Sequence, residues 1–232
     1  MIVLGLDTAT SATVVGLRLA DGRTLQARDD PDAMQRPGHA TRLLALTNDL
    51  LDEAQVDWPE LERIAVGVGP GTFTGLRIGI ATARGLAQSL GVELVGVSSL
   101  RALAYGAAQG TQRDLAAIDA RRGEVFIAAY EGSQELIAPR AVAPDGMAEL
   151  LESAAIDPQA ERWLALGDGA ILYREAFERA GVQVAEDASE DHRIQARAIC
   201  ELGEQASAAQ DPVLPDYRRR PDAEIALEEV EA

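Results

Sequence analysis

Short apolar runs separated by polar turns dominate the first thirty residues of the chain. Residues 2–6 form one such run, which predicts a strand buried on both faces. Residues 12–19 resume strand character with β-branched side chains. Asp21-Gly22 then predicts a tight hairpin turn before a strand over 24–28. We therefore expect the chain to open with three consecutive strands.

Helical and strand patterns alternate after this opening. Apolar residues fall at i, i+3, i+4 and i+7 from Ala40 to Ala54, which is typical of an amphipathic helix. The following segments are expected to be a strand over 63–68, a glycine-rich loop over 69–75, a helix over 76–90, a strand over 92–97 and a helix over 98–109. The first part of the chain thus predicts the order β-β-β-α-β-α-β-α.

The remaining residues repeat these signals more weakly. The predicted elements are strands over 115–118, 124–130 and 163–166, and helices over 144–154, 170–180 and 192–209. We expect an N-terminal lobe over 1–110 and a smaller C-terminal lobe over 111–221. Residues 222–232 hold five acids and no basic residue, which predicts a solvated, disordered tail.

The amino-acid composition excludes several classes of function. The chain has 232 residues, 47% of them hydrophobic, so it can bury a sizeable core. All 21 basic residues are arginine against 38 acids, a net charge of −17. The absence of lysine excludes a Walker-type P-loop and Schiff-base catalysis. The acidity argues against strong autonomous binding to nucleic acid. A single cysteine and no apolar span or signal-peptide pattern predict a reducing, cytoplasmic location.

Two loops are candidate phosphate sites. Asp7, Thr8, Thr10 and Ser11 follow the first predicted strand, where an acid and hydroxyls can hold a phosphate or a Mg²⁺-bound water. The alternative is that these residues only satisfy backbone groups of a turn. Residues 69–75, GPGTFTG, either let backbone approach a ligand in front of a helix or form a tight strand-to-helix turn with Thr74 as the N-cap.

The helix after the glycine-rich loop is a candidate interface. Gly75, Gly79, Ala83 and Ala87 recur every four residues as a flat strip, and other apolar residues face several directions. One side must cover the sheet, so another could meet a second subunit; the alternative is a central helix within the domain. Arg77, alone in this apolar stretch, could pair with a carboxylate or phosphate, or lie along the helix.

The sequence offers few residues that could bind a metal ion or act as a catalytic nucleophile. His39 lies just before the first predicted helix, with no second histidine within a helical turn, so a metal site is not expected there. His39 could instead contact a partner across an interface. Cys200 falls in a helical stretch and is expected in the core.

Several motifs together resemble one family. In order they are DTAT, GHATRLL, VGVGPGTFTGLRIGIATARGLA, VSSL and AIDARRGEVF, followed by LPDYRR near the end. They resemble the bacterial TsaB (YeaZ) family, over roughly residues 1–130. The resemblance implies an α/β actin-like fold (ASKHA, ribonuclease H-like) of two lobes with a reduced second lobe.

The resemblance also implies a function. TsaB is the non-catalytic subunit in the formation of N6-threonylcarbamoyladenosine in tRNA, next to the anticodon. It binds the catalytic paralogue TsaD together with the ATPase TsaE, and it forms a homodimer when alone. The paralogue carries two closely spaced histidines, whereas GHATRLL offers only His39. Contact with tRNA is then expected only through partners, with no membrane and no cofactor beyond weak ATP or ADP at a remnant cleft or subunit boundary.

The family's contacts use the first two helices of the N-terminal lobe. Carried onto this sequence, the interface candidates are His39, Leu43, Leu44, Gly75, Arg77, Ile78, Gly79, Thr82 and Ala83. On this basis Gly79→Arg is expected to abolish pairing without unfolding the monomer.

Two other functions are compatible with the sequence. The first is an independent ATP-dependent kinase or ATPase of the same fold, which needs a second phosphate-binding turn near Asp119 or at Gly167-Asp168-Gly169. The second is a peptidase, an activity once attributed to this wider family. A peptidase is disfavoured because the sequence shows no metal-binding pair and no nucleophile with its base.

Overall fold

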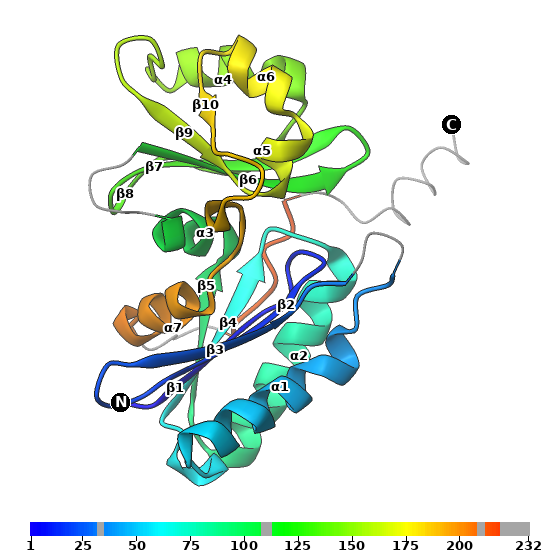
Figure 1. Cartoon of the computed structure of the whole chain (residues 1–232), viewed down its shortest axis with the longest axis vertical. Coiled ribbons are helices and arrows are strands. Elements are labelled where there is room, and N and C mark those ends of the chain that lie inside the picture. The colour runs from blue at the N-terminus through cyan, green and yellow to red at the C-terminus, as the bar shows by residue number, and fades with distance from the viewer. Residues whose placement is uncertain (32–34, 108–112, 208–211, 219–232) are drawn as a thin grey trace.

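The computed structural model describes residues 1–31, 35–107, 113–207 and 212–218. The chain forms two lobes, one above the other in Figure 1, and each is built on a five-stranded sheet. The first sheet lies wholly within residues 3–98 and the second within residues 113–184. The switch from one sheet to the other therefore falls close to the predicted boundary at residue 110.

The first sheet combines a meander with two parallel strands. Its strands are β1 (Val3–Asp7), β2 (Thr13–Arg18), β3 (Thr24–Asp29), β4 (Arg63–Gly69) and β5 (Glu93–Ser98). The spatial order is β3-β2-β1-β4-β5, with β1–β3 antiparallel and β4 and β5 parallel to β1. In the register Leu6 lies beside Val15 on one side and Val66 on the other. The central strands are buried on both faces, which explains their continuous apolar runs.

Helices cover both faces of this sheet. The helices α1 (His39–Ala54) and α2 (Phe73–Leu90) pack on one face, where leucines of α1 and Ile80 of α2 meet side chains of β1, β2 and β4. On the other face lie α3 (Ser99–Ala107) and α7 (Ala196–Gln205), as Figure 1 shows. The predicted order β-β-β-α-β-α-β-α is confirmed for the first lobe.

The second sheet has as many strands as the first, and the helices of this lobe are short. Its strands are β6 (Arg113–Arg121), β7 (Glu124–Glu131), β8 (Gln134–Val142), β9 (Trp163–Leu166) and β10 (Gln183–Val184), in the order β10-β9-β6-β7-β8. Its helices are α4 (Met147–Ser153), α5 (Asp168–Leu172) and α6 (Arg174–Arg179). Three 3₁₀ turns complete the elements: η1 (Trp58–Glu60), η2 (Pro144–Gly146) and η3 (Glu190–His192).

The structure differs from the sequence prediction at several points after residue 110. The strands β8 and β10 were not predicted, because both lie at sheet edges and β8 contains Pro139. The helix predicted over 170–180 is divided at Tyr173 into α5 and α6. The helix predicted from residue 192 starts only at Ala196, after the 3₁₀ turn η3.

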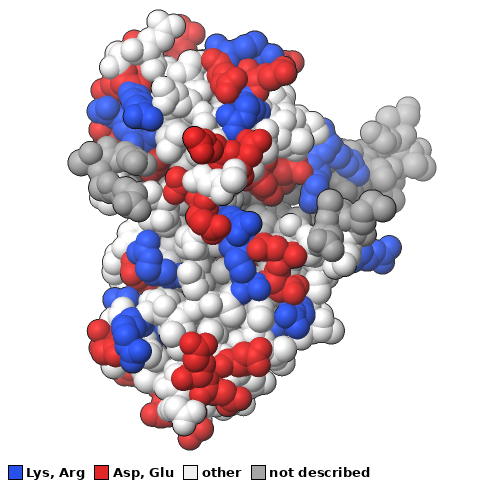
Figure 2. Space-filling model, viewed as in Figure 1, with Lys and Arg blue, Asp and Glu red and all other residues white. Residues whose placement is uncertain are grey.

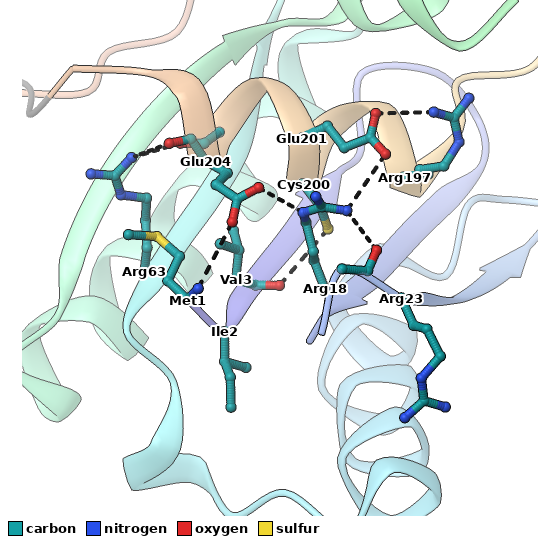
Figure 3. A network of polar contacts seen from close by, with 12 residues as sticks. Met1, Ile2, Val3, Arg18, Arg23, Arg63, Arg197, Cys200, Glu201 and Glu204 are labelled. Carbon is teal, nitrogen blue, oxygen red and sulfur yellow. Dashed lines mark hydrogen bonds and ion pairs between the residues drawn. The ribbon is translucent and has the colours of Figure 1, made fainter. Parts of the chain in front are cut away.

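The helix α7 returns to the first lobe. Its Cys200 lies against two glycines of the first sheet, where a Cβ on Gly5 or Gly16 would stand 2.7 or 2.9 Å from the sulfur. Figure 3 shows the salt bridges that hold this helix on the first sheet. Arg18 of β2 pairs with Glu204 at 2.7 Å and with Glu201 at 3.6 Å. The predicted C-terminal lobe over 111–221 is therefore corrected at its end, because α7 packs on the first sheet. The tail predicted over 222–232 lies outside the described residues.

No helix in the described part of the chain has the length and apolar character needed to cross a bilayer.

Candidate functional site

The acidic residue of the turn between β1 and β2 is buried within the first lobe. Asp7 is fully buried; the Ser99 hydroxyl donates to its Oδ2 at 2.7 Å and the Ala9 amide to its Oδ1 at 2.8 Å. Burial raises the pKa of Asp7 above its ordinary value, although both hydrogen bonds act to lower it. A Cβ on Gly67 would overlap this carboxylate. Asp7 therefore ties the turn to the lobe and presents no oxygen to the surface.

The other three residues of this turn divide between interior and cleft. Thr8 is fully buried, and its hydroxyl donates to the Gly75 carbonyl at 2.7 Å. Thr10 and Ser11 line the space between the lobes. The phosphate-binding prediction is thus corrected for Asp7 and Thr8, which are enclosed, and stays a prediction for Thr10 and Ser11.

The glycine-rich loop packs against this same turn. The Thr72 amide donates to the Ala9 carbonyl at 2.7 Å. A Cβ on Gly71 would overlap the Ala9 carbonyl, and one on Gly75 would overlap the Thr8 carbonyl. The glycines therefore let two backbone segments of the chain touch, as the strand-to-helix alternative predicts. The N-cap is Thr72, not Thr74, which lies within the first turn of α2.

A cleft of about 270 Å³ separates the lobes. Side chains of both charge signs line it: Thr10, Ser11, Arg28 and Asp30 from the first lobe, and Asp168, Asp187, Ser189, His192 and Arg193 from the second. The Asp119 amide donates to Asp168 Oδ1 at 3.0 Å, so the two turns singled out as possible phosphate sites contact each other, and Asp168 lines the cleft. The surrounding protein raises the pKa of Asp168 by desolvation.

His39 fastens the start of α1 to β2. It is 3% exposed, and its Nδ1 lies 2.9 Å from the Thr13 hydroxyl. Burial lowers the pKa of His39, which favours the neutral imidazole. The prediction that His39 contacts a partner is corrected, because its ring is enclosed by its own lobe. Within the described residues, no three His, Cys, Asp or Glu side chains gather as metal ligands.

The strip of small residues on α2 faces inward. Gly75, Gly79 and Ala83 are buried, and a Cβ on Gly79 would overlap the Thr8 hydroxyl oxygen. Leu43 of α1 is likewise 1% exposed and packs in the core of the lobe. The prediction that these four residues contact a partner is therefore corrected, because all four are buried within their own lobe. Gly79→Arg would disrupt the lobe itself and so cannot test pairing.

The outer face of the two helices holds the other candidates. Leu44 and Arg77 are exposed, while Ile78 and Thr82 are half-buried. The sequence analysis missed Ala81 and Gly85, which are exposed on α2 beside them. A helical wheel could have identified them, because at 100° per residue both positions lie opposite the buried Leu76 and Ala83.

The C-terminal segment 212–218 also reaches this face. The Tyr217 ring stacks on Phe73 at the start of α2, with ring centroids 5.3 Å apart. The Tyr217 hydroxyl accepts a hydrogen bond from Arg77 Nε at 2.9 Å. In the sequence, LPDYRR served only as one motif of the family resemblance, because nothing local indicates a contact with residues 140 positions away.

Asp114 is a buried acid that the sequence analysis did not single out. It is 2% exposed on β6, and its Oδ1 has no hydrogen-bond partner. Desolvation, with a smaller contribution from the charge of Asp191, raises its pKa to about 6 against an opposing effect of Arg101. Because the folded pKa exceeds the unfolded value of 3.8, this group stabilises the fold below pH 4 and that contribution is lost as pH rises through 6.

We expect Asp114→Asn to stabilise the protein by about 1–3 kcal/mol at pH 7.5, since a shift of about two units corresponds to that free energy. The gain should disappear near pH 4, where the wild-type carboxyl is protonated. Urea unfolding at both pH values measures it. The control is Asp145→Asn, whose side chain is 95% exposed and should change little. An equal gain at both pH values would contradict the titration as its cause.

Comparison with known proteins places this geometry in a family. Residues 31–227 match the model of the family described as TsaD, tRNA N6-adenosine threonylcarbamoyltransferase. A Pseudomonas aeruginosa structure described as similar to peptidase YeaZ superposes with a TM-score of 0.78 and 34% identity, covering 94% of this chain and 99% of that one. The YeaZ structure from Pseudomonas aeruginosa gives a TM-score of 0.72 and 30% identity, covering 93% and 99%. The chain belongs to the TsaB (YeaZ) branch of the TsaD family.

Curated relatives bear the TsaB name as well. The Escherichia coli (strain K12) tRNA threonylcarbamoyladenosine biosynthesis protein TsaB is 41% identical over 133 residues, which are 56% of this chain and 55% of the relative. The match thus spans about half the length of that relative. The Bacillus subtilis (strain 168) protein of the same name is 29% identical over 97% of this chain and 96% of its own.

Proteins outside the family share the fold of this chain. A ROK hexokinase from Thermus thermophilus superposes with a TM-score of 0.53 at 16% identity, covering 89% of this chain and all of that one, which shows a shared fold alone. The predicted α/β, two-lobed actin-like fold is therefore confirmed. Two surfaces of this TsaB chain remain as candidate sites: the interlobe cleft, and the outer face of α1 and α2 with segment 212–218.

Proposed function

We propose that this chain is the non-catalytic subunit that binds and organises the catalytic paralogue TsaD, together with TsaE, in the formation of N6-threonylcarbamoyladenosine in tRNA next to the anticodon. Membership of the TsaB family supports this role, as do the names of the Escherichia coli and Bacillus subtilis relatives. The match to the TsaD family model supports TsaD as the partner, since paralogues of one fold often pair through equivalent elements.

The observation that carries the proposal is the exposed apolar surface around α2. Six large hydrophobic side chains are exposed among the described residues, and four of them lie on α1, on α2 or on segment 212–218. These four are Leu44, Phe73, Leu214 and Tyr217. The helix α2 also presents the small exposed residues Ala81 and Gly85, which allow a partner helix to approach closely. The same face would hold the homodimer that we expect when TsaD is absent.

Three enclosed residues support a role without bond chemistry. Asp7 presents no oxygen to the cleft, and His39 is held against Thr13. Burial raises the pKa of the Cys200 thiol to about 12, so this sulfur is not a thiolate nucleophile at neutral pH. We therefore assign the threonylcarbamoyl transfer to the paralogue.

The distribution of charge supports contact with tRNA through partners. The chain has a net charge of −17. On the face shown in Figure 2, the described arginines lie among acidic side chains and form no broad basic patch. Such a surface offers little of the phosphate neutralisation on which nucleic-acid binding depends. A cytoplasmic location, where tRNA is modified, completes the proposal and stays a prediction.

One observation favours a second candidate. Asp168, which accepts a hydrogen bond from the Asp119 amide, lines the interlobe cleft together with Thr10 and Ser11. An actin-like ATPase or kinase would bind a nucleotide between such turns. Weak binding of ATP or ADP, at this cleft or at a subunit boundary, stays a prediction of the TsaB interpretation. The ATPase or kinase alternative predicts magnesium-dependent ATP turnover by the protein alone.

An omission assay tests the proposal. The protein is combined with TsaD, TsaE, the enzyme that forms the threonylcarbamoyl adenylate, ATP and tRNA from the same host, and modified adenosine is measured by mass spectrometry. We expect the product to vanish when this chain is omitted, and the chain alone to turn over no ATP. Unchanged product without the chain would overturn the proposed function, and ATP turnover by the lone protein would favour the alternative.

A further inference from the structure

The C-terminal segment 212–218 is fastened along α2 by contacts from both backbone and side chains. The Asp216 amide donates to the Val68 carbonyl at 2.7 Å, at the end of β4. Arg84 donates to the Val213 carbonyl, and the Val213 side chain packs beside β5, 3.3 Å from where a Cβ on Gly96 would stand. Figure 1 shows this segment running beside α2 near the junction of the lobes. We call residues 212–218 the strap.

The strap orients one guanidinium. The Arg77 guanidinium carbon lies 3.7 Å from the centroid of the Phe73 ring, and its Nε donates to the Tyr217 hydroxyl at 2.9 Å. The Phe73 and Tyr217 rings are 38% and 41% exposed, so the cluster lies open to solvent. Among the residues that the structure describes, no carboxylate pairs with Arg77. Its terminal nitrogens, which can bind a carboxylate side-on, form no hydrogen bond to any residue in the described ranges.

The helix α2 and the strap carry more arginine than acid in an otherwise acidic protein. The helix α2 contains Arg77 and Arg84 and no acidic residue. The acid of the strap, Asp216, is paired with Arg218 at 2.6 Å. Among the described residues of α2 and the strap, three arginines thus stand against one acid, in a chain whose net charge is −17. An arginine held in one orientation loses little further side-chain entropy when it binds a carboxylate.

We propose that the strap completes a carboxylate-binding site around Arg77, and that a carboxylate side chain of the catalytic paralogue occupies it when the two subunits pair. This inference rests on the proposed function. Tyr217 is a positioning residue: it acts by holding Arg77 against Phe73. A single guanidinium with two half-exposed rings suits one carboxylate in a protein interface, whereas a nucleic-acid backbone would meet the repulsion of the whole acidic chain. The site exists only when residues far apart in the sequence are brought together.

The test is the affinity of the chain for purified TsaD, measured by calorimetry at 50 and 300 mM salt. We expect Arg77→Ala to raise Kd by about 30-fold at low salt, because it removes one partner of an interfacial ion pair, and to flatten the salt dependence. Tyr217→Ala should weaken binding in the same direction, and Tyr217→Phe less, since it keeps the stacking. Arg140→Ala, an exposed arginine on β8, is the matched control and should bind like the wild type. Thermal unfolding confirms that each variant is folded.

A double-mutant cycle shows whether Tyr217 acts by positioning Arg77 or by contacting TsaD itself. If Tyr217 acts through Arg77, adding Tyr217→Ala to Arg77→Ala should cost almost nothing more. Full additivity would overturn the positioning role. Wild-type affinity of Arg77→Ala for TsaD would overturn the site while leaving the proposed function intact. Failure of the wild-type chain to bind TsaD would overturn both. The same variants are titrated with ADP and with tRNA alone, and a loss confined to either would replace the carboxylate by a phosphate.

Discussion

Replacing Gly85 by arginine is expected to abolish binding to TsaD, and with it the modified adenosine in the reconstituted reaction, while the chain stays folded. Gly85 is exposed on the outer face of α2, and a Cβ there would meet no described atom within 4 Å. The helix therefore accepts a longer side chain without internal strain, and any ordinary residue favours the helix over glycine. A helix packed closely on this face leaves no room for a guanidinium.

Gly85→Ala is the matched control for this variant. It adds one methyl group at the same position, so the flat surface is nearly kept and binding should fall by less than about tenfold. Size-exclusion chromatography of the mixed proteins, calorimetry and the thermal unfolding of each variant alone measure the three effects. If Gly85→Arg bound TsaD like the wild type, the pairing face would have to lie elsewhere than on α2.

Replacing Gly75 by alanine is expected to destabilise the protein by about 3 kcal/mol or more, enough to leave much of the chain unfolded. The added Cβ would overlap the carbonyl oxygen of Thr8, which belongs to the backbone of the β1–β2 turn. The hydrogen bond from the Thr8 hydroxyl to the Gly75 carbonyl is formed at the same contact. Relief requires α2 to move away from the turn, which would open the interior around Asp7.

The control again lies on the same helix. Gly85→Ala makes the same chemical change where there is open space, and it should stabilise the protein by about 0.5–1 kcal/mol through helix propensity. Urea unfolding of the two variants compares them directly. Similar stabilities for Gly75→Ala and Gly85→Ala would contradict the close approach of the two backbone segments.

Local pattern was sufficient for most of the fold. Strands buried on both faces, such as β1 and β4, are short apolar runs, and α1 has the helical period over its whole length. These signals are carried by neighbours in the sequence and so predicted the order of the first lobe. The edge strands β8 and β10 lack them, because an edge strand is half exposed and its residues need not alternate. The resemblance of the motifs to TsaB extended the prediction to the family and the actin-like fold.

The candidate site depended more on packing than on pattern. A helix with apolar residues in several directions does not say which face meets its own sheet, so Gly75, Gly79 and Ala83 were taken for an outer strip when they are the inner one. Asp7 has the sequence signature of a phosphate turn, but Ser99, far along the chain, encloses it.

The sequence by itself therefore determined the order of elements in the first lobe, the acidic charge and the family. Only the tertiary structure decided which small residues touch the β1–β2 turn, which lie outside, and that Tyr217 reaches Arg77 across 140 positions. The physical reason is that periodicity is a short-range property, whereas close backbone contacts and an oriented guanidinium arise from segments that meet only when the chain has folded.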